Sequence, residues 1–517
     1  MRPLTDFTSF ADAQRYCSKE ALWALFDGNR EAFNITHECL DRHPPNATAV
    51  NIVNSQGGID SYTFGQLSEG ANQFANHLYR RGLSPGDVVA VMLEPSFELY
   101  ASIFGAMKAG CIAVPLFTLF GTDGLRLRVD DCRPKLIITN REKVSITEGM
   151  VGPEVQITGQ EFNDLLAIEN KSFKFETKAR DLAVYQYTSG TTREMPEAVH
   201  HTHGSLVTLT LATLYATGIR PGDRFMSPSS PAWGHGLWHG TIAPLSLGVT
   251  MASYAGKFDA GRCIEAMTNL QITNFSAAAT HYRLMRRSGK VRKFKLAVEK
   301  LSYTGEPLDS ETEEWIFKTY GTPAASFYGT TEVGVILASY PGARDFEIKP
   351  GSLGRPVPGV ELAIHDAQGN LCPSETTGEI MMMRRGLWFP TKDLGRIDAD
   401  GYFYHAGRAD DVIITAGYTM SAVEIEDTLL KHPDVDEVAV IGISDNLRGQ
   451  IVKAFIVSER AGSDIFTKEI QEFTQRRLSR HEYPRVVDFV DGLPKTPAGK
   501  LNRKVLRDLS GAGAKQN

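Results

Sequence analysis

Short apolar runs alternate with a segment of helical periodicity between residues 87 and 116, and this alternation restricts the fold more than any other feature of the chain. Residues 87–93 and 111–116 are apolar runs of strand length, and 96–108 carries apolar residues at the spacing of one helix face. A strand, a helix and a second strand in this order are typical of parallel sheets covered by helices. The same order recurs at 182–187 and 205–217, where the intervening loop is rich in Ser, Thr and Gly.

The length of the chain and a change of pattern near residue 407 predict two domains. A single hydrophobic core stops growing at about 250–300 residues, so 517 residues require more than one. We expect an α/β protein with a large N-terminal domain of layered sheets and helices, residues 1–409, and a small mobile α+β C-terminal domain, residues 410–517. The elements expected in the small domain are a strand at 412–415, a helix from the capping box Ser421 and Glu424 to residue 431, strands at 438–443 and 451–457, and a helix at 466–478.

Composition and charge argue against several classes of protein. The net charge of −6 and pI of about 6.1 give no global reason to bind nucleic acid or an anionic membrane. The longest apolar stretch, 102–121, contains Lys108 and Pro115, so it suits a buried helix and strand better than a membrane span. The N-terminal residues lack the apolar region of a signal peptide. We therefore expect a cytoplasmic protein with neither nucleic-acid nor membrane partners.

The cysteines are widely spaced and include no C-x-x-C pair, which disfavours a structural zinc site and a disulfide framework. They are expected to be buried packing thiols: Cys17, Cys39, Cys111, Cys132, Cys263 and Cys372.

Several short motifs carry side chains suited to phosphate chemistry. The loop at 188–192 (Thr188, Ser189, Gly190, Thr191, Thr192) follows a predicted strand and precedes a helix, and its amides and hydroxyls can form a nest for phosphate oxygens. It lacks the Gly-Lys-Ser/Thr of a Walker motif. Glu332, after two threonines, suits Mg²⁺, and Asp393 suits the hydroxyls of a ribose. Taken alone, each is more typical of a turn or a surface charge than of a binding site.

The end of the chain is basic and carries a lysine on a Gly/Pro loop. Residues 476–517 contain ten Lys/Arg and four Asp/Glu, a balance of +6. This balance fits either a solvated surface or a contact for a polyphosphate such as coenzyme A. Lys500, at the end of the loop 493–500, is either an exposed charge or a cation that reaches a phosphate when the small domain moves.

Together, in their order and spacing, these motifs resemble the adenylate-forming superfamily of acyl-CoA synthetases, carrier-protein-loading adenylation domains and beetle luciferases. The resemblance extends from about residue 35 to 507, and the segment 481–485 looks closest to medium-chain and aryl acyl-CoA synthetases. Further matching segments are 279–283, 305–307, 351–356 and 407–411.

The resemblance implies a role for each matching residue, with ATP, Mg²⁺ and coenzyme A as cofactors. The loop Thr188–Thr192 would bind the β- and γ-phosphates, and Glu332 would bind Mg²⁺. Lys500 would join the attacking carboxylate to the α-phosphate, and Asp410 would be the hinge. The remaining residues would hold adenine (Gly305, Glu306, Pro307, Tyr328), the α-phosphate loop (Gly329, Thr330, Thr331), the ribose (Asp393, Arg408) and coenzyme A (Gly417, Tyr483, Arg485).

The phosphate loop departs from the family pattern, which continues Thr-Thr-Gly-x-Pro-Lys. Here Arg193 stands where a glycine is expected, and Glu197 stands where a lysine is expected, with one extra residue in the loop. We expect Arg193 to supply the missing positive charge. The alternative is a loop that sits differently and binds ATP weakly.

The pocket for the acid is implied between 231–238 and 277–279, closed by 333–335. Trp233, Ala278 and Gly334 would line it, and small residues on two walls leave room for a bulky apolar acid: aryl, cyclic, terpenoid or medium-chain. His235 would either orient the carboxylate or pack in an aromatic wall. Three hypotheses stay open: an acyl-CoA synthetase, an enzyme that loads a carrier protein, and a non-catalytic nucleotide-binding relative. A homodimer is also left open.

Overall fold

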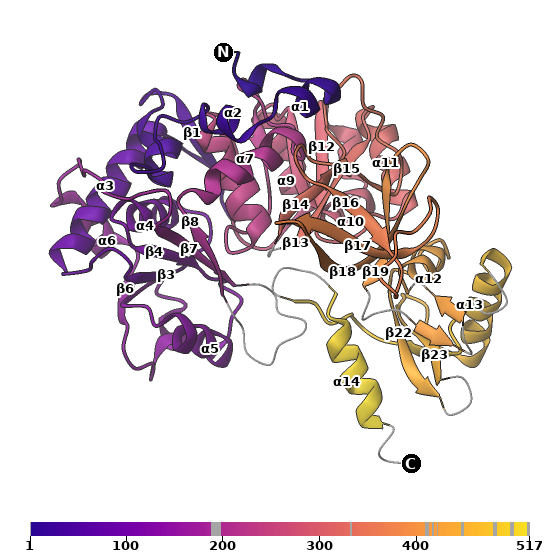
Figure 1. Ribbon diagram of the computed structural model, residues 1–517. Coiled ribbons are helices and arrows are strands. Elements are labelled where there is room, and N and C mark those ends of the chain that lie inside the picture. The colour runs from indigo at the N-terminus through magenta and orange to yellow at the C-terminus, as the bar shows by residue number, and fades with distance from the viewer. Residues whose placement is uncertain are drawn as a thin grey trace. The chain divides into compact units, whose positions relative to one another are not determined.

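The computed structural model describes residues 2–187, 198–330, 333–408, 413–415, 418–420, 422–445, 449–478, 483–496 and 501–513 (Figure 1). The chain divides into two compact units. Unit 1 takes in Met1–Gly305, Trp315–Ile348 and Val357–Gly359, and unit 2 takes in Glu306–Glu314, Lys349–Pro356 and Val360–Asn517. The predicted boundary between residues 409 and 410 lies within unit 2 and stays a prediction.

Helices and strands alternate through most of unit 1, as the sequence pattern predicts. The helices have these bounds: η1 (Leu4–Asp6), α1 (Phe10–Tyr16), α2 (Lys19–Trp23), η2 (His37–Asp41), α3 (Phe64–Arg80), α4 (Phe97–Lys108), α5 (Thr122–Cys132), η3 (Val144–Thr147), α6 (Gln160–Ala167), α7 (Ser205–Tyr215), η4 (His235–Ile242), α8 (Ala243–Ser246), α9 (Ala260–Asn269), α10 (Ala279–Ser288), η5 (Lys290–Lys293) and α11 (Ser310–Tyr320), through which the division between the units passes.

One sheet of unit 1 contains the predicted strand–helix–strand unit. Its order is β6-β5-β3-β4-β7-β8, and all neighbours are parallel except β7 and β8. Ser96 starts α4 by accepting a hydrogen bond from the Leu99 N–H. Lys108, at the end of α4, is buried and forms an ion pair with Asp41. The strands are β3 (Val88–Met92), β4 (Ile112–Pro115), β5 (Leu136–Thr139), β6 (Glu154–Ile157), β7 (Leu182–Tyr187) and β8 (Ala198–Thr202).

The second sheet of unit 1 is parallel in its centre and positions the candidate site. From one end, the order is β2-β1-β10-β9-β11-β12-β13-β14, with antiparallel pairs only at β2 and β14 among the described residues. The strands are β1 (Thr48–Val53), β2 (Ile59–Thr63), β9 (Phe225–Met226), β10 (Met251–Tyr254), β11 (Asn274–Ala278), β12 (Lys300–Thr304), β13 (Ala324–Thr330) and β14 (Gly334–Ala338).

Unit 2 contains two groups of strands. The first has the order β16-β17-β18-β19-β15 and is antiparallel throughout. In the second, β21-β20-β23-β22 are in order and β24 pairs in parallel with β23. The bounds are β15 (Ser352–Pro356), β16 (Leu362–His365), β17 (Gly378–Arg384), β18 (Leu387–Ile397), β19 (Phe403–Arg408), β20 (Ile413–Thr415), β21 (Tyr418–Met420), α12 (Ala422–Leu429), β22 (Glu437–Asp445), β23 (Gly449–Val457), α13 (Asp464–Arg477), β24 (Val486–Phe489) and α14 (Arg503–Gly513).

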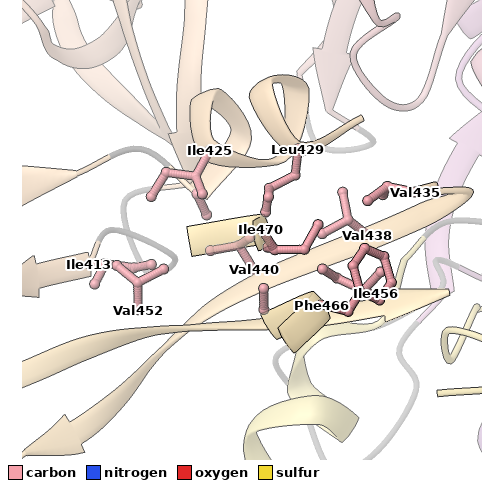
Figure 2. Close-up of a cluster of buried hydrophobic side chains, with 12 residues drawn as sticks. Ile413, Ile425, Leu429, Val435, Val438, Val440, Val452, Ile456, Phe466 and Ile470 are labelled. Carbon is pink, nitrogen blue, oxygen red and sulfur yellow. The ribbon is translucent and has the colours of Figure 1, made fainter. Parts of the chain in front are cut away.

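The core of the second group of strands is built by alternation along β22 and β23. Val438 and Val440 of β22 join a cluster with Ile425 of α12 and Phe466 of α13, whose side chains Figure 2 shows pointing toward one another. The intervening β22 residues belong to another cluster, which contains Leu506 of α14. Since successive strand residues point to opposite faces, the helices cover both faces of this sheet.

The elements predicted for residues 412–478 are all present, with small differences at their ends. The helix predicted to end at residue 431 stops at Leu429, and the strands predicted at 438–443 and 451–457 extend to Glu437–Asp445 and Gly449–Val457. Ser421, the predicted N-cap, lies outside the described residues. These differences fall within the ordinary uncertainty of element boundaries.

Two predictions about the rest of the chain have different outcomes. Cys17 and Cys372 are partly exposed, so the expectation that all six cysteines are buried is wrong for these two, whereas the other four are buried. Cys17 lies just after the short helix α1, and Cys372 follows the isolated bridge between His365 and Leu371. Within the described residues, no helix is both long enough and apolar enough to cross a membrane.

Candidate active site

His235 begins the π-helix η4 and is held by serines from two other segments. Its Nδ1 is 2.8 Å from Ser229 Oγ, and its Nε2 is 2.8 Å from Ser276 Oγ of β11. Ser276 in turn accepts a hydrogen bond of 2.8 Å from Ser302 of β12. The imidazole is 4 % exposed. This chain of hydroxyls satisfies both ring nitrogens and fixes the ring in place, as a packed wall residue requires.

Gly236, next to His235, allows η4 to lie close to the backbone of Ser229 and Ser230. A Cβ atom at Gly236 would lie 2.1 Å from the Ser230 carbonyl oxygen, so no other residue fits there without a shift of the backbone. The Trp233 ring, half-buried, lies 5.2 Å from the His235 ring. The structure therefore brings Trp233 and His235 together, as predicted for one wall of the acid pocket.

The carboxyl ends of β11, β12 and β13 lie at one edge of the second sheet. Ala278 pairs with Thr304, and Tyr303 pairs with Ser326, so Ala278, Thr304 and Phe327 stand at one level and on one face. The Thr304 hydroxyl donates a 2.9 Å hydrogen bond to the Phe327 carbonyl and fixes this level. Ligands of parallel α/β sheets bind at this edge. Ser276, the partner of His235, lies two residues before Ala278, one level deeper.

The predicted adenine segment leads into a tight hairpin. Tyr328 is half-buried, and the pairing of β13 with β14 shifts between Tyr328 and Gly329. A Cβ atom at Gly329 would lie 1.9 Å from the Gly334 carbonyl oxygen, and Gly334 itself has φ +74°. Glycine is therefore required at both positions. Thr330 ends β13, while Thr331 and Glu332 lie outside the described residues.

The other predicted adenine residues follow β12. Gly305 comes directly after Thr304 and has φ +96°, a conformation that favours glycine. It belongs to unit 1, whereas Glu306 and Pro307 belong to unit 2.

The two predicted ribose residues face each other across one antiparallel pair. Asp393 of β18 pairs directly with Arg408 of β19, and Asp393 is 4 % exposed. His405 Nε2 lies 3.5 Å from Asp393 Oδ1. The Asp393 N–H donates to the Thr391 hydroxyl, which donates to the Ile380 carbonyl. The backbone around this buried carboxylate is thus held at a fixed place in the sheet.

The base of the predicted lysine loop is anchored on both sides. Lys495 forms an isolated bridge with Leu501, and the Asn502 N–H donates to the Pro494 carbonyl at 2.8 Å. Immediately afterwards, Arg503 Nη2 binds both carboxylate oxygens of Glu426 in α12, at 2.7 and 2.6 Å. Lys500 itself lies outside the described residues, between the anchored positions Lys495 and Leu501.

The predicted coenzyme A residues lie before β24. The Arg485 guanidinium lies over the Tyr483 ring, 4.9 Å from its centroid, and the Arg485 N–H donates to the Val452 carbonyl of β23 at 2.8 Å. A guanidinium that stacks on an aromatic ring keeps its N–H groups available at the edge. Gly417, the third predicted residue, lies outside the described residues.

The remaining predicted residues also lie outside the described residues: Thr188, Ser189, Gly190, Thr191, Thr192, Arg193, Glu197 and Asp410. In the part of the chain that the structure does describe, no cluster of three or more His, Cys, Asp or Glu side chains could hold a metal ion.

Two histidines near these residues were missed by the sequence analysis. His405 pairs with Gly395, two residues after Asp393, because the pairing of β18 with β19 shifts between Leu394 and Gly395, and no sequence pattern marks this shift. His239, one turn after His235, is 7 % exposed and packs edge-on against Phe327, with 5.5 Å between ring centroids. Its spacing of four from His235 is the available sequence signal.

Family models and known relatives match most of the length of this chain. The model of the AMP-binding enzyme family matches residues 37–388, and the model of its C-terminal domain matches 424–500. An uncharacterized acyl-CoA ligase of Bacillus subtilis is 31 % identical, over 89 % of this chain and 92 % of the relative. A 3-hydroxybenzoate–CoA ligase of Aromatoleum sp. is 30 % identical, over 88 % and 93 %. The solved anthranilate CoA ligase with anthranoyl-AMP has a TM-score of 0.86 at 26 % identity, over 95 % and 99 %.

Proposed function

The chain belongs to the AMP-binding enzyme family and is an AMP-forming acyl-CoA synthetase, and we propose that its acid is bulky and largely apolar. Such an enzyme adenylates a carboxylic acid with ATP and then transfers the acyl group to coenzyme A. The classes we propose are aryl, cyclic, terpenoid and medium-chain acids.

The observation that carries this proposal is the composition of the two walls at the carboxyl edge. Trp233 lies beside His235, which is bound by Ser229 and Ser276, and Ala278 and Phe327 lie at the edge of the sheet, with the Phe327 ring 5.7 Å from the His235 ring. Aromatic and small side chains accept a broad apolar body. The relatives described above, a 3-hydroxybenzoate and an anthranilate ligase, act on aryl acids, which supports the aryl class.

The first half-reaction needs positive charge where the transition state concentrates negative charge. Lys500 joins the acid carboxylate to the α-phosphate, and the loop Thr188–Thr192 holds the β- and γ-phosphates. Asp393 and Arg408, paired in the sheet, hold the ribose, and Tyr328 packs on adenine.

Mg²⁺ commonly takes one carboxylate together with phosphate oxygens, and Glu332 is the carboxylate we assign to it. When bound, Mg²⁺ would neutralise charge on the phosphates.

The second half-reaction uses the same acyl-adenylate but a different face of the small domain. Rotation about Asp410 withdraws Lys500 and brings Gly417 to the thiol path, while Tyr483 and Arg485 contact coenzyme A.

The protein acts in the cytoplasm, and a homodimer is a further prediction that sedimentation in solution measures.

The test of the acid class is a pyrophosphate-release assay with ATP, Mg²⁺ and a panel of aryl, cyclic, terpenoid, medium-chain and short acids. Thioester formation is then followed by mass after addition of coenzyme A. Preference for acetate over every bulky acid would contradict the proposed class. Pyrophosphate release without a coenzyme A thioester would favour a carrier protein as acceptor, and no release with any acid would favour a non-catalytic relative.

Separate assays of the two half-reactions test Lys500 and Asp410. Lys500→Ala should slow adenylation by about 10²–10³-fold, because it removes a charge needed only in that transition state, and should leave a pre-made acyl-adenylate convertible to thioester. Equal loss of both half-reactions in Lys500→Ala would show that Lys500 is structural.

Asp410→Pro, which fixes φ near −65°, should abolish one half-reaction and spare the other. Full turnover in Asp410→Pro would contradict the assignment of Asp410 as the hinge.

A second pair of variants tests the unusual phosphate loop. If Arg193 replaces the charge of the missing lysine, Arg193→Ala should raise the KM for ATP more than the KM for the acid. Glu197→Lys should lower the KM for ATP, because it removes repulsion of the phosphates. Unchanged ATP dependence in both variants would mean that the loop binds phosphate through amides and hydroxyls alone.

A further inference from the structure

His239 differs from His235 in how its ring nitrogens are used. It lies one turn further along η4, with 6.2 Å between the two ring centroids, and is 7 % exposed. His239 Nδ1 is buried and has no hydrogen-bond partner among the described residues. Buried polar atoms nearly always have a partner, and a group without one in the protein is a candidate for contact with a ligand or water.

The sheet register places His239 at the level where a substrate binds. Phe327, which the His239 ring meets edge-on, stands level with Ala278 and Thr304 at the carboxyl edge. His235 contacts Ser276, one level deeper. Both rings pack against Phe327, but both nitrogens of His235 are bound, whereas His239 Nδ1 is unused among the described residues.

The chemistry of the ring suits a neutral partner. Burial lowers the pKa of His239 to about 4, so the imidazole is neutral at physiological pH. A neutral imidazole offers one donor and one acceptor. A hydroxyl group, which can both donate and accept, can pair with either tautomer, whereas an ionised group would need a charge that the ring does not carry.

We propose that His239 is a specificity-determining residue that hydrogen-bonds a hydroxyl substituent on the apolar body of the acid, so that the substrate class is a hydroxylated bulky acid. The proposal rests on the proposed function, because it takes η4 and the ends of β11–β13 as the walls of the acid pocket. In this proposal the polar group that contacts the acid is His239 and not His235, which already has two serine partners.

The experiment compares matched pairs of acids that differ by one hydroxyl: benzoate against each monohydroxybenzoate, and octanoate against 8-hydroxyoctanoate. For each pair, kcat/KM is measured in the wild-type protein, in His239→Phe and in His239→Asn. His201→Phe is the control, because His201 Nε2 is also buried without a partner among the described residues, but its ring packs on Trp238 at 4.8 Å. Thermal melting checks that each variant folds.

We expect at least one hydroxylated acid to exceed its parent by about 10-fold or more in the wild-type protein, as a site built for a hydroxyl discriminates against the analogue that lacks it. His239→Phe should remove most of that preference by lowering kcat/KM for the hydroxylated acid. His239→Asn, which keeps a donor and an acceptor, should retain part of it, and His201→Phe should leave the ratio unchanged.

The proposal is overturned if no wild-type pair shows a preference for the hydroxylated acid, a result that does not depend on the folding of any variant. It is also overturned if His239→Phe folds and keeps the ratio. Absence of pyrophosphate release with every acid would instead overturn the proposed function, and this proposal with it.

Discussion

At the scale of single residues, His235 and His239 show that two imidazoles one helical turn apart differ in their hydrogen bonds. His235 is the middle of a hydrogen-bonded chain from Ser229 through Ser276 to Ser302, whereas His239 Nδ1 is buried without a partner among the described residues. Both rings pack against Phe327, so the difference lies in the serines that reach His235.

His235→Ala should therefore act mainly on stability. It leaves the hydroxyls of Ser229 and Ser276 without their partner and opens a cavity, which together cost about 2–4 kcal/mol. Thermal melting should show a fall in Tm of several degrees, with a smaller change in the relative kcat/KM values of different acids. If Tm is unchanged while the KM for every acid rises at least tenfold, His235 contacts the acid carboxylate.

Sequence reasoning found His235 and missed its environment for a physical reason. The serines that bind it come from positions 229, 276 and 302, and only the parallel register of β11 and β12 brings the last two together. Nothing local in the sequence encodes such a register. The pairing of Asp393 with Arg408 was, in contrast, accessible, because both residues lie in motifs that were recognised and β18 is followed directly by β19.

At the scale of elements, an ion pair between Arg503 and Glu426 joins the start of α14 to α12. Arg503 and Glu426 are 19 % and 13 % exposed at their side chains, and Glu426 also accepts from the Val440 N–H at 2.7 Å. This pair lies three residues after Lys500. It therefore ties the base of the lysine loop to both a helix and a strand of the small domain.

Arg503→Met should loosen this base. Removal of the guanidinium from a largely buried ion pair costs stability, so we expect a lower Tm and a fall of about tenfold in adenylation, with less effect on thioester formation from a pre-made adenylate. Lys504→Met, one residue later and exposed, is the control and should change neither. Adenylation at the wild-type rate in Arg503→Met would show that the lysine loop does not depend on this pair.

Elements were easier to predict than their ends or their partners. The strand at 182–187 and the start of the helix at Ser205 agree with the sequence pattern because an apolar run and a turn bound them clearly. The helix α12 ends at Leu429, two residues before the predicted end, because the helix-breaking residue that follows it, Pro433, lies several residues further on. The isolated bridge between Lys495 and Leu501 has no periodic pattern and could not be read from the sequence.

At the scale of the whole molecule, buried neutral histidines link folding to pH. Burial lowers the pKa values of His201 and His239 to about 4 and that of His203 to about 3. His203 Nδ1 accepts a hydrogen bond from the Ile35 N–H at 3.1 Å, which requires the unprotonated nitrogen. In the unfolded chain these residues titrate near pH 6.5.

The free energy of unfolding should therefore fall as the pH falls from about 6.5 toward 4, because the unfolded chain binds protons that the folded chain excludes. Each histidine contributes on the order of 1–2 kcal/mol between pH 7 and 5. Chemical denaturation at pH 7, 6 and 5 measures this, and His201→Phe should reduce the slope. A free energy that stays constant from pH 7 to 5 would contradict the assignment.

The two levels of the proposed pocket wall also matter for laboratory evolution of new substrate ranges. The deeper level is a closed chain of hydroxyls around His235, and a library there would yield mostly variants that fail to fold. The upper level, with Ala278, His239 and Phe327, has no such chain among the described residues. Randomising those three positions together would sample different acid shapes and leave the hydrogen-bonded chain around His235 unchanged.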